Sequence, residues 1–219
     1  MQLIEGIRLE NTQPKKSAVM YYKTEPFVHG IRSYHHTNNW EILKACEIIA
    51  SKGYSIDLID RSNKNWIPKK EYDLFLGLGV GNSGDQFVKY AKASKAKKRV
   101  LLAMGPQPDI SNKLVIQRYE MFNKRTGLNA PAMRTVEKVI GSNFEEIIKN
   151  TDYILCIGEE GTNSSNSFLK YNIPVLNFYP AISNKVKFNN DWKKSRKRNH
   201  FLCFAGNGLI CKGVDLVVE

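Results

Sequence analysis

Short apolar runs recur along the chain between polar and glycine-bearing segments. Their length and their sharp boundaries are typical of buried strands. The runs that predict strands are 18–22, 54–60, 73–79, 99–104, 153–157 and 174–178. Because these runs are almost continuously apolar, we expect them to be covered on both faces, as in a parallel sheet.

Helical spacing separates these runs. Ile42, Cys46 and Ile49 fall on one face of a helix that begins at Asn38 or Asn39 and ends at Gly53. Further helices are predicted at 85–96, 110–126, 144–149 and one ending at 168–171. Residues 24–37 are expected to form a loop, and the residues before 18 a polar lead-in. The alternation predicts a Rossmann-like α/β fold with a doubly wound, mostly parallel sheet.

The segment HFLCFAGNGLICKGVDLVVE, at 200–219, begins another unit of the same kind. It predicts a strand at 201–205, a glycine-bearing turn and a helix from Val214. A domain does not normally end within such a unit, since the unit has nothing to pack against. We therefore expect an N-terminal domain at 1–183, an interdomain linker at 184–199 and a truncated second α/β domain at 200–219.

Composition is that of an ordinary globular protein, with 42% hydrophobic and 25% charged residues. The chain has no signal-peptide pattern and no apolar run near the roughly 20 residues that span a bilayer, so a cytoplasmic location is expected. Cys46, Cys156, Cys203 and Cys211 lack metal-site or redox-motif spacing and are expected to be reduced core thiols.

The net charge of +12 is concentrated in the predicted linker. Residues 184–200 hold seven basic side chains against one acidic one, which is half of the total. The densest part comprises Lys193, Lys194, Arg196, Lys197 and Arg198. One interpretation is a solvated linker, and another is contact with anionic lipid at the inner face of the cell membrane. Nucleic acid is not an expected partner, because no helix-turn-helix or base-stacking pattern accompanies the charge.

The stretch 79–84 matches G-x-G-x-x-G after a strand. The dinucleotide fingerprint also needs an acidic residue about 20 positions on, and it belongs to the first strand–helix turn. This match follows the third predicted strand, and 100–105 (VLLAMG) offers no acid. The pattern favours a flexible loop near a cleft. A dehydrogenase remains an alternative, which a flat titration with NADH would exclude.

A histidine-bearing loop follows the first predicted strand. Ligands of open α/β sheets bind beyond the carboxyl ends of the strands, which makes this an acceptor-side candidate. Its candidate residues are Glu25, His29, Gly30, His35, His36 and Asn38. His29 and His36 are candidate general bases. The alternative is an ordinary polar loop. No metal is expected, since adjacent histidines point in different directions.

A second candidate lies in the turn Gly206-Asn207-Gly208, which Lys212 follows. Backbone N–H groups and one cation at a helix start suit a diphosphate.

With these elements in order, the chain resembles the bacterial group 1 nucleotide-sugar glycosyltransferases, whose architecture is the two-domain GT-B fold. FLCFAGNGLICKGVDLVVE is similar to the opening of their donor domain, and HTNNWEILKACEIIASKGYSIDLID to their first helix and second strand. EYDLFLGLG, QRYEMFNKRTG and TDYILCIGEEGTNSSNSFLKYNIPV also resemble surface-polysaccharide members. The resemblance covers nearly all of the chain after residue 17.

The resemblance implies an acceptor-binding N-terminal domain, a donor-phosphate lysine at Lys212 and independence of metal ions. Asn207 stands where the family usually has an arginine, and the double glycine of its acceptor loop is missing near Gly30. The expected activity is transfer from a nucleotide-sugar donor to a carbohydrate or lipid-linked acceptor. The chain alone is expected to be inactive, because the family's acidic donor pair would fall beyond Glu219. The alternative is a non-catalytic sugar- or nucleotide-binding module, or a degenerate remnant. Sequence downstream of Glu219 would distinguish these readings.

Overall fold

The computed structural model describes residues 3–10, 12–30, 38–80, 84–133, 144–180 and 209–217. The chain divides into two compact units. The sheet unit comprises residues 1–108 and 137–182, and the second unit comprises 109–136 and 183–219. The division differs from the boundaries expected from sequence, because 109–136 groups with the C-terminal segment.

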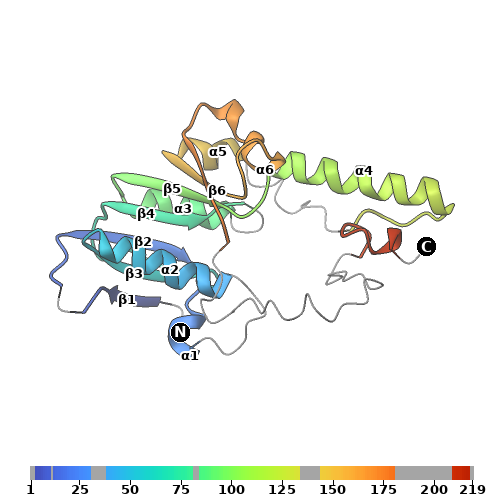
Figure 1. Cartoon of the computed structure of the whole chain (residues 1–219). Coiled ribbons are helices and arrows are strands. Elements are labelled where there is room, and N and C mark those ends of the chain that lie inside the picture. Colours follow the sequence, from blue (N-terminus) through green and yellow to red (C-terminus); the bar gives the residue numbers. More distant parts are fainter. Residues whose placement is uncertain are drawn as a thin grey trace. The chain divides into compact units, whose positions relative to one another are not determined.

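The sheet unit is built on seven strands in the order β1-β3-β2-β4-β5-β6-β7 (Figure 1). The strands are β1 (Leu3–Ile7), β2 (Lys16–Tyr22), β3 (Tyr54–Asp60), β4 (Leu74–Leu78), β5 (Lys98–Ala103), β6 (Tyr153–Ile157) and β7 (Val175–Phe178). Every pairing is parallel except that of β1 with β3. The expected α/β class and mostly parallel sheet are confirmed, and the arrangement is Rossmann-like.

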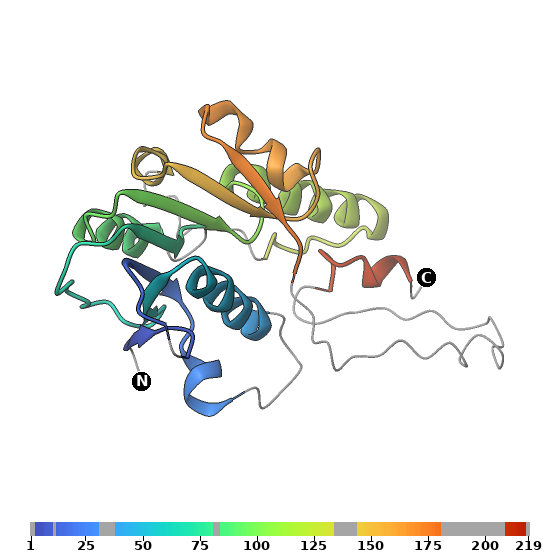
Figure 2. The same cartoon turned by 60° about the vertical axis from the view of Figure 1, so that its left-hand side comes forward.

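Helices cover the two faces of this sheet unequally. On one face, α2 (Asn38–Ser51) packs Ile42 and Cys46 against Met20 and Leu58. On the other face lie α3 (Gly84–Ala93) and α5 (Phe144–Lys149), together with the short α6 (Asn163–Asn166) and the 3₁₀ helix η2 (Leu169–Tyr171). Figures 1 and 2 show α2 beside the β2–β3 part of the sheet. The two cores are thus built from alternate residues of the same strands.

The expected polar lead-in is wrong for Leu3–Ile7, which forms the antiparallel edge strand β1. The buried carboxylate of Asp57 holds it in place, because Oδ1 accepts the Gly6 N–H at 3.0 Å. Oδ2 accepts the Tyr72 hydroxyl at 2.7 Å and pairs with Lys70 Nζ at 2.9 Å. Three donors therefore satisfy one buried charge, which would otherwise be very unfavourable.

The expected loop at 24–37 is also wrong in part, because Glu25–His29 forms the one-turn helix α1. Pro26 has the backbone angle of a first helical turn and lacks the N–H that such a turn leaves unpaired. The N–H groups of Phe27 and Val28 both donate to the Thr24 carbonyl. Gly30 ends the helix at φ +65°, a conformation that glycine adopts without strain.

The second unit contains α4 (Pro108–Thr126), which begins at the unit boundary, and the 3₁₀ helix η4 (Val214–Leu216). Asp215 joins them, since its carboxylate accepts hydrogen bonds from Arg118, at 2.5 Å, and from Arg125. The predicted helix from Val214 is here a single 3₁₀ turn. The predicted strand at 201–205 and the linker at 184–199 lie outside the described residues.

Among the described residues, no helix is both long enough and apolar enough to cross a membrane.

Candidate functional site

Polar side chains gather where β2 ends and α2 begins, at the carboxyl edge of the parallel sheet. This edge is where open α/β sheets bind ligands. Of the acceptor-side residues predicted from sequence, Glu25, His29, Gly30 and Asn38 lie near this edge. Glu25 is exposed and pairs with Lys23 at 3.7 Å, and His29 is exposed at the end of α1. His35 and His36 lie outside the described residues.

Tyr22, the last residue of β2, lies at this carboxyl edge and contacts the first turn of α2. Its buried hydroxyl donates a 3.0 Å hydrogen bond to Oε2 of Glu41 in the first turn of α2. Burial raises the pKa of Tyr22 well above its ordinary value, and the Glu41 carboxylate raises it further. The positive charge of Arg61 and a hydrogen bond with the Asn38 side chain lower this pKa in part. The tyrosine is therefore a neutral donor at physiological pH.

The neighbouring polar groups pair with one another. Asp60, at the end of β3, accepts hydrogen bonds from the Thr24 N–H and hydroxyl, both at 3.0 Å. Burial disfavours the charged form of Asp60, but hydrogen bonds from Ser62 and Thr24 outweigh it and lower the pKa. Lys23 donates to Asn39 Oδ1 at 3.3 Å. These contacts fix α1 and the start of α2 to the ends of β2 and β3.

Glu41 differs from these neighbours because one of its oxygens is unsatisfied. Oε1 is buried and, within the described part of the chain, makes no hydrogen bond. Buried polar atoms usually have a partner, so such an atom needs an explanation. Glu41 also lines the apolar groove described next.

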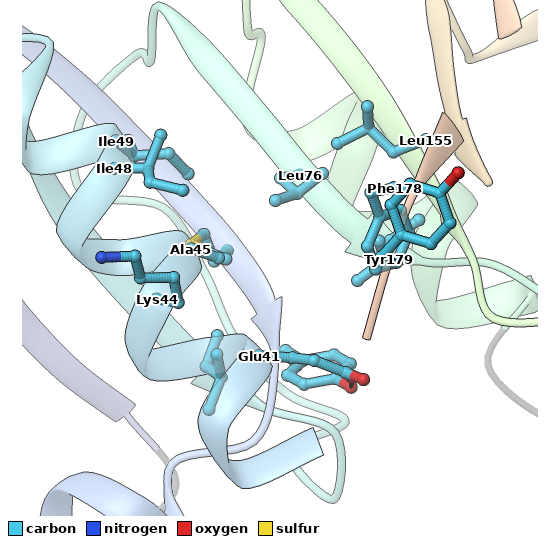
Figure 3. A pocket seen from close by; sticks show the side chains of 13 residues that line it. Glu41, Lys44, Ala45, Ile48, Ile49, Leu76, Leu155, Phe178 and Tyr179 are labelled. Carbon is cyan, nitrogen blue, oxygen red and sulfur yellow. Dashed lines mark hydrogen bonds between the residues drawn. The ribbon is translucent and has the colours of Figure 1, made fainter. Parts of the chain in front are cut away.

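An apolar groove of about 280 Å³ runs along the face of the sheet on which α2 packs (Figure 3). Its floor consists of apolar strand side chains, namely Met20, Leu76, Leu102 and Leu155. Ala45, Ile48 and Ile49 of α2 form one side, and Phe178 and Tyr179 at the end of β7 form the other. The only ionisable groups among its lining residues other than tyrosine are Glu41 and Lys44.

The handedness of the crossovers explains why this groove is open. The connection from β2 to β3 runs toward one edge of the sheet, and α2 therefore packs on one face. Connections from β4 onward run toward the opposite edge, and within the sheet unit right-handed crossovers place α3, α5 and η2 on the other face. In the described part of the sheet unit, no helix covers the α2 face of β5, β6 and β7. Leu102, Leu155 and Phe178 are consequently only partly buried.

The predicted donor-phosphate residue Lys212 is exposed in a turn of the second unit, directly before Gly213 and η4. Its N–H donates to the Leu209 carbonyl at 3.2 Å. Gly206, Asn207 and Gly208 lie outside the described residues. The diphosphate role of this segment stays a prediction.

Packing explains why the first residue of the G-x-G-x-x-G match, Gly79, is a glycine. A Cβ at this position would meet Leu101 Cδ1 at 2.3 Å and the Phe87 ring at 3.1 Å. Gly79 therefore lets β4 lie against β5 and α3. Residues 81–83 lie outside the described ranges.

The described residues contain no group of three or more His, Cys, Asp or Glu side chains placed to hold a metal ion. Neither a scan of protein-family models nor a search of curated proteins finds a match to this chain.

Sequence reasoning did not identify Tyr22, Glu41 or the groove as parts of a site. A side chain at the end of β2 and another in the first turn of α2 carry no motif in common. The direction of each crossover decides which face of the sheet stays open, and that direction is given by the spatial order of the strands, not by a motif in the sequence.

Proposed function

We propose that this chain belongs to a nucleotide-sugar glycosyltransferase of the GT-B type, and that its sheet unit is the acceptor side. The observation that carries the proposal is the polar edge at the end of β2, where Tyr22, Asn38 and Glu41 meet beside an apolar groove. The Rossmann-like sheet and the sequence resemblance support the same class.

In this proposal the donor is a nucleotide sugar and the acceptor is a carbohydrate or a lipid-linked glycan. Hydrogen-bonding groups at the carboxyl edge would orient an acceptor hydroxyl, and a positioned base would take its proton. His29 and His36 are the candidate bases. Lys212 would stabilise the departing diphosphate together with the backbone of Gly206, Asn207 and Gly208. No cofactor or metal ion is part of the proposal.

The basic segment at Lys193, Lys194, Arg196, Lys197 and Arg198 would place such an enzyme at an anionic membrane surface, where lipid-linked acceptors are found. Binding to anionic vesicles that weakens with added salt would support this part of the proposal. Equal binding to neutral vesicles would contradict it.

The decisive experiment measures sugar transfer. The purified chain and the longest polypeptide that its reading frame encodes are each incubated with a panel of nucleotide sugars and lipid-linked or oligosaccharide acceptors. We expect transfer from the longer polypeptide, and we expect Lys212→Ala to lower kcat/KM by about tenfold or more. Lys64→Ala, at an exposed lysine of the sheet unit, is the matched control. Failure of the longer polypeptide to transfer from any donor would overturn the proposal.

A non-catalytic sugar- or nucleotide-binding module is the second candidate. Asn207 favours it, because asparagine supplies hydrogen bonds but no charge where the resembled family has an arginine. Saturable binding of a sugar or nucleotide without transfer by either polypeptide would identify this module.

A further inference from the structure

We propose that Asp215 is a positioning residue for Lys212. The two arginines of α4, Arg118 and Arg125, hold the carboxylate of Asp215, and a hydrogen-bonded turn joins this aspartate to the lysine. All four residues belong to the second unit. This inference rests on the proposed function, in which Lys212 binds the donor diphosphate.

Arg118 and Arg125 place two cations on one face of α4. They lie close to two helical turns apart, so their side chains leave the helix in nearly the same direction. Nη2 of Arg118 donates to Oδ1 of Asp215 at 2.5 Å and to Oδ2 at 2.6 Å, and Nη2 of Arg125 also donates to Oδ2. The Asp215 side chain is only 12% exposed. Charge-assisted hydrogen bonds shielded from water in this way are stronger than those of fully exposed ion pairs.

Little apolar contact holds the segment 209–217 apart from this cluster. None of its residues is buried, and Leu209, Leu216 and Val217 are each more than half exposed. Among the described residues, its only side-chain hydrogen bonds are those that Asp215 accepts. Burial disfavours the charged form of Asp215, but hydrogen bonding and the arginine charges outweigh burial and hold its pKa below the ordinary value. The ionised aspartate is therefore the main anchor of the segment on α4.

Backbone hydrogen bonds link Asp215 to Lys212. The N–H groups of Lys212 and Val214 both donate to the Leu209 carbonyl, at 3.2 and 3.1 Å. Gly213 lies between them with a left-handed φ of +74°, and its carbonyl accepts an N–H of η4 at 3.0 Å. The lysine and the aspartate thus belong to one hydrogen-bonded turn, and the backbone of Lys212 follows the anchor.

The chemistry of lysine makes this anchoring useful. The Lys212 side chain is exposed and carries a compact point charge on a flexible four-carbon stem. Such a stem defines the position of its charge poorly unless the backbone is held. Misplacement of a positioned group by about 1 Å can lower a rate by a large factor. Loss of the anchor should therefore weaken the donor binding that the lysine provides.

Hydrogen exchange with mass spectrometry tests the anchor on the full chain, without any donor. Asp215→Asn removes the charge at nearly constant shape, so the amide protons of 212–217 should exchange at least about fivefold faster. Glu120→Gln, at an exposed carboxylate of α4, is the matched control and should leave these rates unchanged. Unchanged exchange in the sheet unit verifies that the variants are folded. In Arg118→Gln/Asp215→Asn the rates should be no faster than in Asp215→Asn, because the pair acts as a unit.

Two results of this experiment would overturn the anchor. One is equal exchange at 212–217 in Asp215→Asn and Glu120→Gln. The other is an absence of protection of these amides in the original protein, because a turn that is held by Asp215 must exchange more slowly than an unfolded segment.

Steady-state kinetics of the longer polypeptide tests the positioning role, with the nucleotide sugar of the panel that gives the highest rate. Asp215→Asn should raise the donor KM by about threefold or more and leave the acceptor KM unchanged, whereas a purely structural loss would lower kcat alone. In Lys212→Ala/Asp215→Asn the donor KM should equal that of Lys212→Ala, because the aspartate acts through the lysine.

Failure of the positioning role and failure of the proposed function give different results. Transfer with an unchanged donor KM in Asp215→Asn rejects only the positioning role. Absence of transfer by the longer polypeptide rejects the proposed function and the role of Lys212 with it, and hydrogen exchange still decides whether Asp215 anchors the turn.

Discussion

The Tyr22 hydroxyl donates a 3.0 Å hydrogen bond to Oε2 of Glu41, and this contact joins the end of β2 to the first turn of α2. Both residues line the groove. The contact thus sets the position of the carboxylate whose other oxygen lacks a partner.

Tyr22→Phe should destabilise the sheet unit by about 1–3 kcal/mol, because it leaves the second, part-buried oxygen of Glu41 without the tyrosine donor. Urea unfolding followed by circular dichroism measures the loss. In the double variant Tyr22→Phe/Glu41→Leu no carboxylate remains, so its loss should be smaller than the sum of the two single losses. Tyr179→Phe is the control, since that tyrosine is 71% exposed. Equal midpoints for Tyr22→Phe and Tyr179→Phe would refute the buried-acceptor argument.

Gly79→Ala should also destabilise the sheet unit, by about 1–3 kcal/mol, because its Cβ would lie 2.3 Å from Leu101 Cδ1. Leu101 is fully buried and has little room to move. Gly105→Ala is the matched control, since nothing lies within 4 Å of a Cβ there. Shortening the neighbour in Gly79→Ala/Leu101→Val should recover part of the loss. A Gly79→Ala protein as stable as Gly105→Ala would show that the glycine has no packing role.

Strands were the part of the fold most readable from sequence. The runs at 54–60 and 153–157 coincide with β3 and β6. β6 is apolar throughout and β3 is apolar at Ile56, Leu58 and Ile59, and each run is bounded by a glycine on one side and a charged residue on the other. β1 was missed, since Glu5 and Gly6 interrupt its apolar pattern and its pairing with β3 is irregular at that point. The conformation of β1 depends on the distant Asp57 rather than on its own residues. Local pattern carries no information about such a contact.

Less of the candidate site than of the fold could be predicted from the sequence. The carboxyl edge was expected because a loop follows the first predicted strand of an open α/β sheet, and Asn38 was correctly placed at the start of α2. The Tyr22–Glu41 contact joins residues 19 positions apart on different elements, and neither residue type is unusual at its position. The groove is a property of the whole sheet, because it is the area that the crossover helices leave uncovered.

The rate of thiol modification should differ among the three cysteines that the structure describes. Burial raises the pKa of the Cys46 thiol to about 12 and that of Cys156 to about 11, whereas Cys211 is partly exposed. Because the thiolate is the reactive form, maleimide labelling at pH 8 should modify Cys211 at least about tenfold faster than the two buried thiols. Peptide mass spectrometry assigns each site. In urea the three rates should become similar. Rapid labelling of Cys46 in the native protein would show that α2 does not pack as described.

Arg99 and Asp152 should make stability depend on acid pH. The Arg99 guanidinium donates to both carboxylate oxygens, at 3.1 and 2.9 Å, and these hydrogen bonds hold the pKa of Asp152 below its ordinary value. The unfolded chain therefore binds this proton more readily than the folded one. The stabilisation is present above the unfolded pKa of about 3.9 and is lost as the pH falls through the lower folded pKa.

Asp152→Asn should accordingly lower the free energy of unfolding by about 1 kcal/mol at pH 7, a modest amount because the pair is partly exposed to solvent. The difference between the variant and the original protein should shrink as the pH is lowered from 5 toward 2. Urea unfolding at several pH values measures it, with Glu160→Gln, at an exposed carboxylate of the same unit, as the control. A difference that stays constant down to pH 2 would mean that the pair does not stabilise the fold through the ionised carboxylate.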